Sequence, residues 1–169
     1  APDNPYIGVI LPYAPLQLLL FSYNDGLHMP DLLVMTSANR SGMPICRTDE
    51  EVRTDLPGLC DLILSHDRDI LLRVDDSVVT LFEEEPYMIR RSRGYAPLPI
   101  YVNGDFHGTV LSAGGELKNT VCLAKDNLFY LSPHIGDVGC VRTETAQHEC
   151  AVRLRDLLEI TPQCGAADI

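Results

Sequence analysis

The sequence predicts a protein of the α/β (α+β) class, arranged as two successive domains. Two observations lead to this prediction. Apolar runs typical of strands alternate with segments of helical character over residues 6–92. A stretch rich in proline and glycine, residues 93–105, then precedes a part of different rhythm, with short strands and one long helix. We expect a first domain over residues 1–97, a linker over 98–108 and a second domain over 109–169.

The composition is that of an acidic globular protein. Twenty-four acidic and 13 basic residues among 169 give a formal charge of −11, which argues against general binding of nucleic acid. A few arginines focused in one pocket could still bind a nucleotide. No segment reaches the ~18 to 20 apolar residues of a membrane span, and the first residues lack the pattern of a signal peptide. We therefore expect a cytoplasmic protein without membrane contact.

The six cysteines form neither a CxxC pair nor a tight cluster with histidine. A zinc site needs such closely spaced ligands. The cysteines are therefore predicted to be free thiols, and no metal ligand is predicted in this chain.

Local patterns predict the elements of the first domain. Residues 6–22 favour a short strand, a proline turn and an apolar helix. Residues 48–56 favour a helix that starts with a capping box, formed by Thr48 and Glu51. Strands are expected at 31–36, 61–66, 75–82 and 87–92, the last two antiparallel around the acidic run at 83–85.

In the second domain, "TVLSAGG" predicts a strand that ends in a glycine turn. "NTVCLAKDNLFYLS" predicts a hairpin, because Asp126 and Asn127 separate two alternating apolar runs. Residues 142–160 predict one amphipathic helix that begins at Thr143.

Small polar residues follow the apolar run that ends at Met35, in "VMTSANRSGMPI". Thr36, Ser37 and Asn39 could present hydroxyl and amide groups to a ligand at the end of a strand, as in many nucleotide sites. They could equally satisfy their own backbone in a turn. This segment alone does not decide between the two.

Two further polar groups lie at the ends of the predicted strands. "VDDSVVT" places Asp75, Asp76 and Ser77 at the start of one strand, and "IRRSRGY" places three arginines at the end of the next, namely Arg90, Arg91 and Arg93. Arginine's planar fork suits phosphate. Alternation along a strand would allow at most two of the three to share a pocket, unless the strand has already ended. Surface ion pairs with the acidic run at 83–85 are the weaker interpretation.

These motifs resemble a known family. "TSANRSGMPI" resembles the SAN motif of the YrdC/Sua5 family, and "HDRDILLRVDDSVV" with "IRRSRGYAPLPI" resembles its HypF branch. "SAGGELKNTVCLAKDNLFYLSPHIGDV" resembles the start of the Kae1-like domain of HypF, a member of the actin-like ATPase superfamily. The resemblance implies a twisted mixed sheet with helices, from the C-terminal part of a YrdC-like domain, followed by the N-terminal part of a Kae1-like domain.

The resemblance also implies chemistry. HypF-type carbamoyltransferases use carbamoyl phosphate and ATP to make carbamoyl adenylate, and pass the carbamoyl group to the C-terminal cysteine of HypE for the cyanide ligands of NiFe-hydrogenase. ATP and Mg²⁺ are implied here, and zinc in a part of the parent enzyme outside this chain. No nucleophilic side chain is implied, because a carbamate oxygen attacks the α-phosphate. The resemblance implies nucleotide binding by Thr36, Ser37, Asn39 and Ser77, Mg²⁺ binding or arginine positioning by Asp75 or Asp76, and charge neutralisation by Arg90, Arg91 or Arg93 as pyrophosphate leaves.

In the second domain, Gly114, Gly115 and Lys118, with Asn119 and Thr120, resemble the first phosphate loop of an actin-like ATPase. Taken alone, "GGELK" is more typical of a hairpin turn with an exposed lysine. "SPHIGDV" adds His134 and Asp137 in a loop that contains glycine. His134 could be a ligand or a capped loop histidine, and the residues alone favour the capped histidine.

The chain departs from the family pattern at Pro133, where glutamine is usual, and at Met43, where an acidic residue is usual. Two alternatives remain open: a threonylcarbamoyl-adenylate synthase, which the Kae1-like continuation disfavours, and a non-catalytic interaction module that docks through the apolar run at 16–21.

Overall fold

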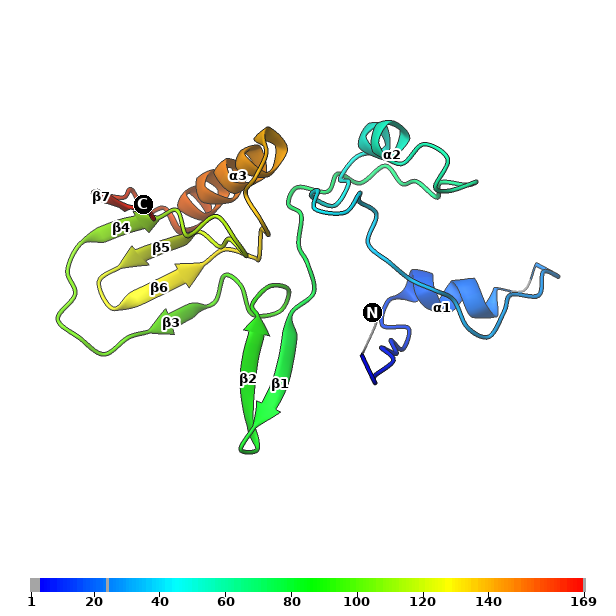
Figure 1. The fold of residues 1–169 in the computed structure, drawn as a ribbon, viewed down its shortest axis with the longest axis horizontal. Helices are drawn as coiled ribbons and strands as arrows, with labels where there is room; N and C mark the ends of the chain where they lie inside the picture. The colour runs from blue at the N-terminus through cyan, green and yellow to red at the C-terminus, as the bar shows by residue number, and fades with distance from the viewer. Residues whose placement is uncertain (1–3, 24, 169) are drawn as a thin grey trace. The chain divides into compact units, whose positions relative to one another are not determined.

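The structure, a computed structural model, describes residues 4–23 and 25–168 and falls into two units, residues 1–36 and 37–169, which are treated separately. The elements in chain order are α1 (Pro15–Ser22), α2 (Asp49–Asp55), β1 (Val78–Phe82), β2 (Glu85–Arg90), β3 (Pro99–Tyr101), β4 (Thr109–Ser112), β5 (Cys122–Lys125), β6 (Leu128–Leu131), α3 (Val141–Leu158) and β7 (Cys164–Ala166) (Figure 1). This arrangement confirms the mixed α and β class.

The first unit contains α1 as its one helix among the described residues. Proline at its first position and a Gln17 side chain that accepts the backbone N–H groups of Tyr13 and Ala14 (2.9 and 3.1 Å) define its start. The strands predicted within residues 6–22 and 31–36 are wrong: both segments lie outside any strand, and Val34 is 99% exposed. A strand needs a hydrogen-bonded neighbour, and these segments have none among the described residues.

The second unit opens with a turn and the short helix α2. Thr48 caps this helix as predicted, because its hydroxyl accepts the N–H of Glu51 at 3.2 Å. The carboxylate of Glu51 accepts the N–H of Arg47 rather than that of Thr48, so the return bond of the expected capping box is shifted by one residue. The strand predicted at 61–66 is also wrong, since these residues are exposed and pair with no strand.

The antiparallel pair predicted around the acidic run is confirmed as the hairpin of β1 and β2, with Phe82 opposite Glu85. Glu83 and Glu84 form its turn with φ values of 50° and 67°. Two left-handed residues give a turn whose twist matches that of the strands. The turn is thus made without glycine.

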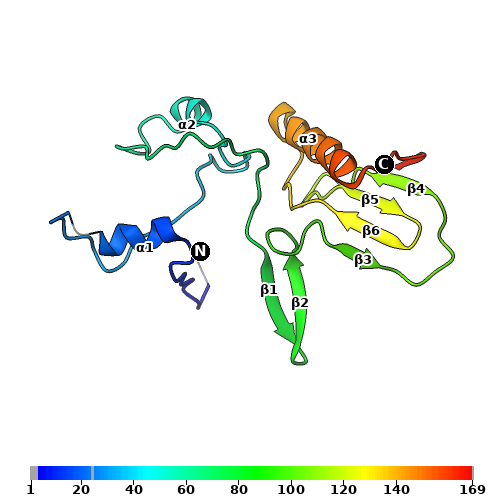
Figure 2. The ribbon, with the colours of Figure 1, turned by 180° about the vertical axis from the view of Figure 1, so that it is seen from behind.

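A five-stranded sheet forms the centre of the second unit, in the order β3-β6-β5-β4-β7 (Figure 2). The hairpin of β5 and β6 is confirmed, with Asp126 in the left-handed region at its turn. Two strands are additions to the prediction. β3 lies inside the segment predicted as a linker and pairs with β6, and β7 runs parallel to β4 after α3 has returned the chain.

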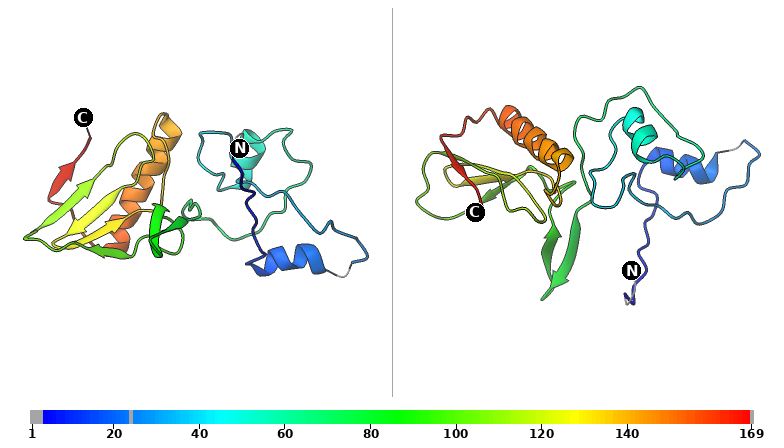
Figure 3. Two further views of the ribbon diagram at one scale, coloured as in Figure 1. Left: turned by 60° about the horizontal axis from the view of Figure 1, so that its bottom comes forward. Right: turned by 45° about the horizontal axis from the view of Figure 1, so that its top comes forward.

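Helix α3 packs on one face of this sheet (Figure 3). It begins at Val141 after Cys140, two residues before the predicted start, and the hydroxyl of Thr143 accepts the Cys140 N–H at 3.2 Å. Its buried residues recur every three or four positions, at Thr143, Ala146, Cys150 and Leu154. Leu154 joins the core around Leu123, which is fully buried.

Two leucines on α3 allow a matched test of this packing. Leu154 is 4% exposed and Leu157 is 68% exposed. Leu154→Ala should lower the free energy of unfolding by about 2 to 5 kcal/mol, because it removes buried carbon and leaves a cavity. Leu157→Ala should change it by less than about 0.5 kcal/mol. Urea unfolding followed by circular dichroism measures both; equal losses would contradict this packing.

Candidate functional site

The SAN segment forms a tight turn, held together by Asn39. Its carboxamide NH₂ donates to the backbone carbonyls of Arg40 and Met43, at 3.1 and 2.8 Å. Its buried Oδ1 has no partner among the residues that the structure describes. Thr36 ends the first unit and Ser37 starts the second, and both are exposed. The turn interpretation therefore applies to the Asn39 amine, while its oxygen stays available as an acceptor.

Two predicted arginines face the predicted aspartates. Arg90 lies 3.8 Å from Asp75, and Arg93 lies 3.6 Å from Asp76. The hydroxyl of Ser77 donates to the carbonyl of Arg93 at 2.8 Å, which joins the start of β1 to the segment after β2. The aspartates thus hold arginine side chains in place, and strand alternation does not apply to Arg93 because β2 ends at Arg90.

Arg91 has a different environment. Its guanidinium donates to the carbonyls of Tyr95 and Leu98, both at 2.9 Å, and lies 5.9 Å from the centre of the Tyr95 ring. These two hydrogen bonds and the cation–π contact hold the turn at residues 92–98 in place. Arg91 therefore supports backbone, while Arg90 and Arg93 carry the exposed charge of the group.

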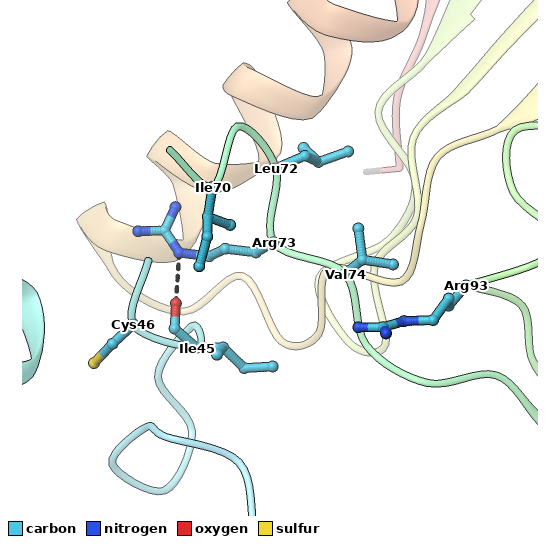
Figure 4. Close-up of a pocket in the computed structure, with 7 residues that line it drawn as sticks. All are labelled: Ile45, Cys46, Ile70, Leu72, Arg73, Val74 and Arg93. Carbon is cyan, nitrogen blue, oxygen red and sulfur yellow. Dashed lines mark hydrogen bonds between the residues drawn. The ribbon is translucent and has the colours of Figure 1, made fainter. Parts of the chain in front are cut away.

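A cavity of about 470 Å³ lies next to these groups (Figure 4). It is lined by Ile45, Cys46, Ile70, Leu72, Arg73, Val74 and Arg93. An apolar wall with a few charged groups is typical of a ligand site, and its volume falls in the usual range. The cavity lies between residues 45–46, which follow the SAN turn, and residues 70–74, which precede Asp75. Arg93 lines it from a third segment.

Arg73 is a site residue that the sequence interpretation missed. Its Nε donates to the carbonyl of Ile45 at 2.7 Å, as Figure 4 shows, and its Nη2 lies 2.7 Å from Glu51. It also lies 3.5 Å from Glu149 of α3, which Arg47 approaches to 3.2 Å. The signal in the sequence was a single arginine inside the apolar run "ILLRV".

The carboxylate of Glu51 lies within this charged group. Burial alone would raise its pKa, but the Arg47 N–H and the Arg73 guanidinium hold the pKa of Glu51 below its usual range. Glu51 is therefore ionised at neutral pH and keeps Arg73 oriented along the cavity wall.

The predicted phosphate loop lies between β4 and β5. Gly114 has a φ of 72°, and a Cβ there would lie 2.6 Å from the carbonyl of Thr120, so only glycine fits. Lys118 is 80% exposed on its side chain and lies 3.5 Å from Asp137, whose carboxylate also accepts the Lys118 N–H at 2.9 Å. That N–H and then the ammonium lower the pKa of Asp137. The contacts between Lys118 and Asp137 thus join the glycine loop to the loop "SPHIGDV".

His134 connects the two groups of predicted residues. Burial lowers its pKa, and the positive charge of Arg90 lowers it further, opposed by Asp75 and Asp137. Its imidazole is therefore neutral at pH 7. Arg90, the last residue of β2, and His134, in the loop next to Lys118, are therefore close enough within the second unit for their charges to interact.

The described residues contain neither a metal-ligand cluster nor a disulfide. Within residues 4–23 and 25–168, no three or more His, Cys, Asp or Glu residues cluster to hold a metal ion. The six cysteines are unpaired, and burial raises the pKa of Cys150 to about 11. None of the described helices has both the length and the apolar character to cross a membrane.

Comparison with known families agrees with these two groups of residues. Residues 1–92 match the Sua5–YciO–YrdC family model, described as telomere recombination, and residues 105–169 match the model of the HypF Kae1-like domain. The chain belongs to the Sua5–YciO–YrdC family, whose model matches more than half of its residues. The order of the two matches agrees with the resemblance of the SAN and "SAGGELKNT" motifs.

Curated relatives and solved structures that resemble the chain are HypF proteins. The chain is 42% identical over 181 residues to carbamoyltransferase HypF2 of Cupriavidus necator and 40% identical over 169 residues to carbamoyltransferase HypF of Synechocystis. All of the chain is covered in both, but only 22% and 21% of those relatives. A full-length HypF crystal structure in the phosphate- and nucleotide-bound form matches 79% of the chain and 21% of its own, with a TM-score of 0.73 and 36% identity. The chain thus spans about a fifth of its relatives.

The effect of Arg90 on His134 can be measured by NMR titration of the imidazole. In Arg90→Gln the pKa of His134 should rise, because a positive charge that opposes protonation is removed. At any one pH, the ring signals of His107, whose side chain is 82% exposed next to Asp105, should be the same in Arg90→Gln as in wild type and serve as the control. An unchanged His134 titration would place Arg90 away from the loop.

Proposed function

We propose that the chain is part of a carbamoyltransferase that makes carbamoyl adenylate from ATP and carbamoyl phosphate. Carbamoyl phosphate is first hydrolysed to carbamate and phosphate. An oxygen of carbamate then attacks the α-phosphorus of ATP, the bond to the β-phosphate oxygen breaks, and pyrophosphate leaves. The carbamoyl group finally passes to the thiolate of the C-terminal cysteine of HypE, and AMP is released.

The cavity beside Arg93 is the observation that supports this assignment most. It lies between the segment after the SAN turn and the segment before Asp75, and its wall is largely apolar. An apolar wall suits an adenine ring, while Arg93 in the lining would stabilise charge on the departing pyrophosphate, with Arg90 three residues earlier in the chain as a second positive charge. Asp75 and Asp76 orient these arginines through the pairs at 3.8 and 3.6 Å.

Mg²⁺ would enter with ATP rather than bind to a preformed site. The described part of the chain holds no acidic cluster for it, and both candidate aspartates are paired with arginine. Ser37, Asn39 and Ser77 would contribute polar groups around the nucleotide, and Thr36 directly precedes Ser37 in the chain. Of these, Asn39 has a buried and unpaired oxygen that can accept a hydrogen bond.

The loop at Gly114 and Gly115 would bind the phosphates of a second ATP molecule. Glycine at both positions allows backbone N–H groups to approach phosphate, and Lys118 adds a mobile positive charge nearby. The relatives' name, carbamoyltransferase, supports a carbamoyl-transfer reaction for the whole protein.

Arginine replacement tests the first step. In the full-length protein, Arg93→Ala should lower the rate of carbamoyl-phosphate-dependent exchange between ATP and pyrophosphate by about 100-fold to 1,000-fold, because a charged donor at the leaving phosphates is lost. Arg93→Lys should recover part of the rate. Exchange of labelled pyrophosphate into ATP is the measurement.

The matched control is Arg155→Ala. This arginine is also exposed and paired with a neighbouring aspartate, Asp156 at 2.7 Å, but it lies at the end of α3. Its removal should leave the exchange rate unchanged. If both alanine variants exchange at the wild-type rate while remaining folded, Arg93 has no part in adenylate formation.

A further inference from the structure

Asn119 is the most deeply buried polar side chain of the glycine loop region, with 2% exposure. Its carboxamide NH₂ donates to the carbonyl of Ala113 at 2.8 Å and to the carbonyl of Gly115 at 2.6 Å. Two carbonyl acceptors fix which side of the carboxamide is the NH₂. Asn119 therefore holds both sides of Gly114 from within the protein.

The backbone of Asn119 binds the neighbouring loop. Its N–H donates to the carbonyl of Gly136 at 2.8 Å, and its carbonyl accepts the N–H of Ile135 at 2.9 Å. The residue is thus the junction between the glycine loop and the loop that contains His134.

The hydrogen bonds of Asn119 set the direction of the loop's donors. In a trans peptide the C=O and the N–H point in opposite directions. The carbonyls of Ala113 and Gly115 point toward Asn119, so the N–H groups of Gly114 and Glu116 point away from it. Two N–H groups that point away from the protein at one turn can donate together to an anion.

We infer that Asn119 is a positioning residue that holds the N–H groups of Gly114 and Glu116 in the geometry that receives nucleotide phosphate. The inference rests on the proposed nucleotide role of this loop. Asn119 acts through the two carbonyls and does not touch the phosphate.

The unpaired oxygen of Asn119 supports a role beyond stability. Its Oδ1 is buried without a donor among the described residues. A buried acceptor without a donor is unfavourable for folding, so its presence calls for an explanation other than stability, such as a functional role. An apolar or smaller residue would avoid this cost but would release both carbonyls.

The chain supplies a matched control in Asn127. Its NH₂ also donates to two carbonyls, those of Val102 and Gly104, at 2.9 and 2.8 Å. Asn127 follows β5, whereas Asn119 precedes it, so the two lie at opposite ends of the same strand. Loss of either side chain removes the same number and type of hydrogen bonds.

The experiment is amide hydrogen exchange on the full-length protein, followed over residues 113–118 at increasing Mg-ATP concentration. Wild type should show protection of the Gly114 and Glu116 amides. In Asn119→Ala, the concentration that gives half protection should rise by about 10-fold to 100-fold, because the donors are no longer preoriented. Asn127→Ala should match wild type in this concentration, even if it unfolds at a lower temperature.

Gln147→Ala gives a second, milder variant. The carboxamide NH₂ of Gln147 donates to the carbonyl of Ala113 alone, at 2.8 Å. Loss of this one hydrogen bond should raise the half-protection concentration less than Asn119→Ala does. This variant decides the inference if Asn119→Ala fails to fold.

The outcomes separate the two proposals. A wild-type loop that Mg-ATP does not protect would overturn the nucleotide role of the loop, and the inference with it. A protected wild-type loop with unchanged half-protection concentrations in Asn119→Ala and Gln147→Ala would overturn the inference alone. A purely structural Asn119 would lower the melting temperature in both asparagine variants without changing the nucleotide concentration.

Discussion

The packing of α3 against β5 is the interaction on which the second unit depends. Leu123, Leu154 and Ile160 form its buried centre, and the partly buried Leu111 and Tyr130 complete the contact. Because one face of α3 is fixed by this apolar contact, polar residues at its edges acquire fixed positions as well. Gln147 reaches the carbonyl of Ala113 in the glycine loop, and Glu149 reaches Arg73 at the cavity wall. The apolar packing of α3 is strong because it removes carbon from water, but it is not specific. It fixes the helix and so positions the specific polar contacts of Gln147 and Glu149.

The ion pairs of α3 add orientation more than stability. Glu149 meets Arg47 and Arg73, and Arg142 lies 2.6 Å from Asp55, so the helix presents one acid and one base to the segment around α2. Pairs that keep contact with water contribute about 0 to 1 kcal/mol each, well below the cost of losing a buried leucine. Their opposite signs at two points along α3 instead disfavour a reversed or shifted arrangement, since either would bring like charges together.

Local signals in the sequence predicted the parts of this fold that are held by local interactions. The cap at Thr48, the turn at Asp126 and the apolar period of α3 each depend on residues close together in the sequence. The structure confirms the helices and the hairpin that these signals predict. The apolar run at 31–36 led to the prediction of a strand that the structure does not contain, because a strand is defined by a neighbour elsewhere in the chain. β3 and β7 have three residues each, too few for a period to show. Arg73 was missed for a related reason: its partners, Glu51 and Glu149, lie far away in sequence.

The two interpretations of the SAN segment, a turn and a phosphate site, do not exclude each other. Asn39, Asn119 and Asn127 use the same device, in which one NH₂ group holds two backbone carbonyls. The carboxamides of Asn39 and Asn119 differ from that of Asn127 in that each has a buried oxygen without a partner among the described residues. Each of these two residues comes from a motif that resembles a nucleotide site, whereas Asn127 lies in an ordinary hairpin turn. An asparagine that shapes a turn through its amine can serve a ligand either through the oxygen that remains or through the backbone donors that it orients. The turn is then the means by which the site is built, and the sequence pattern of a polar turn and that of a phosphate loop coincide for a physical reason.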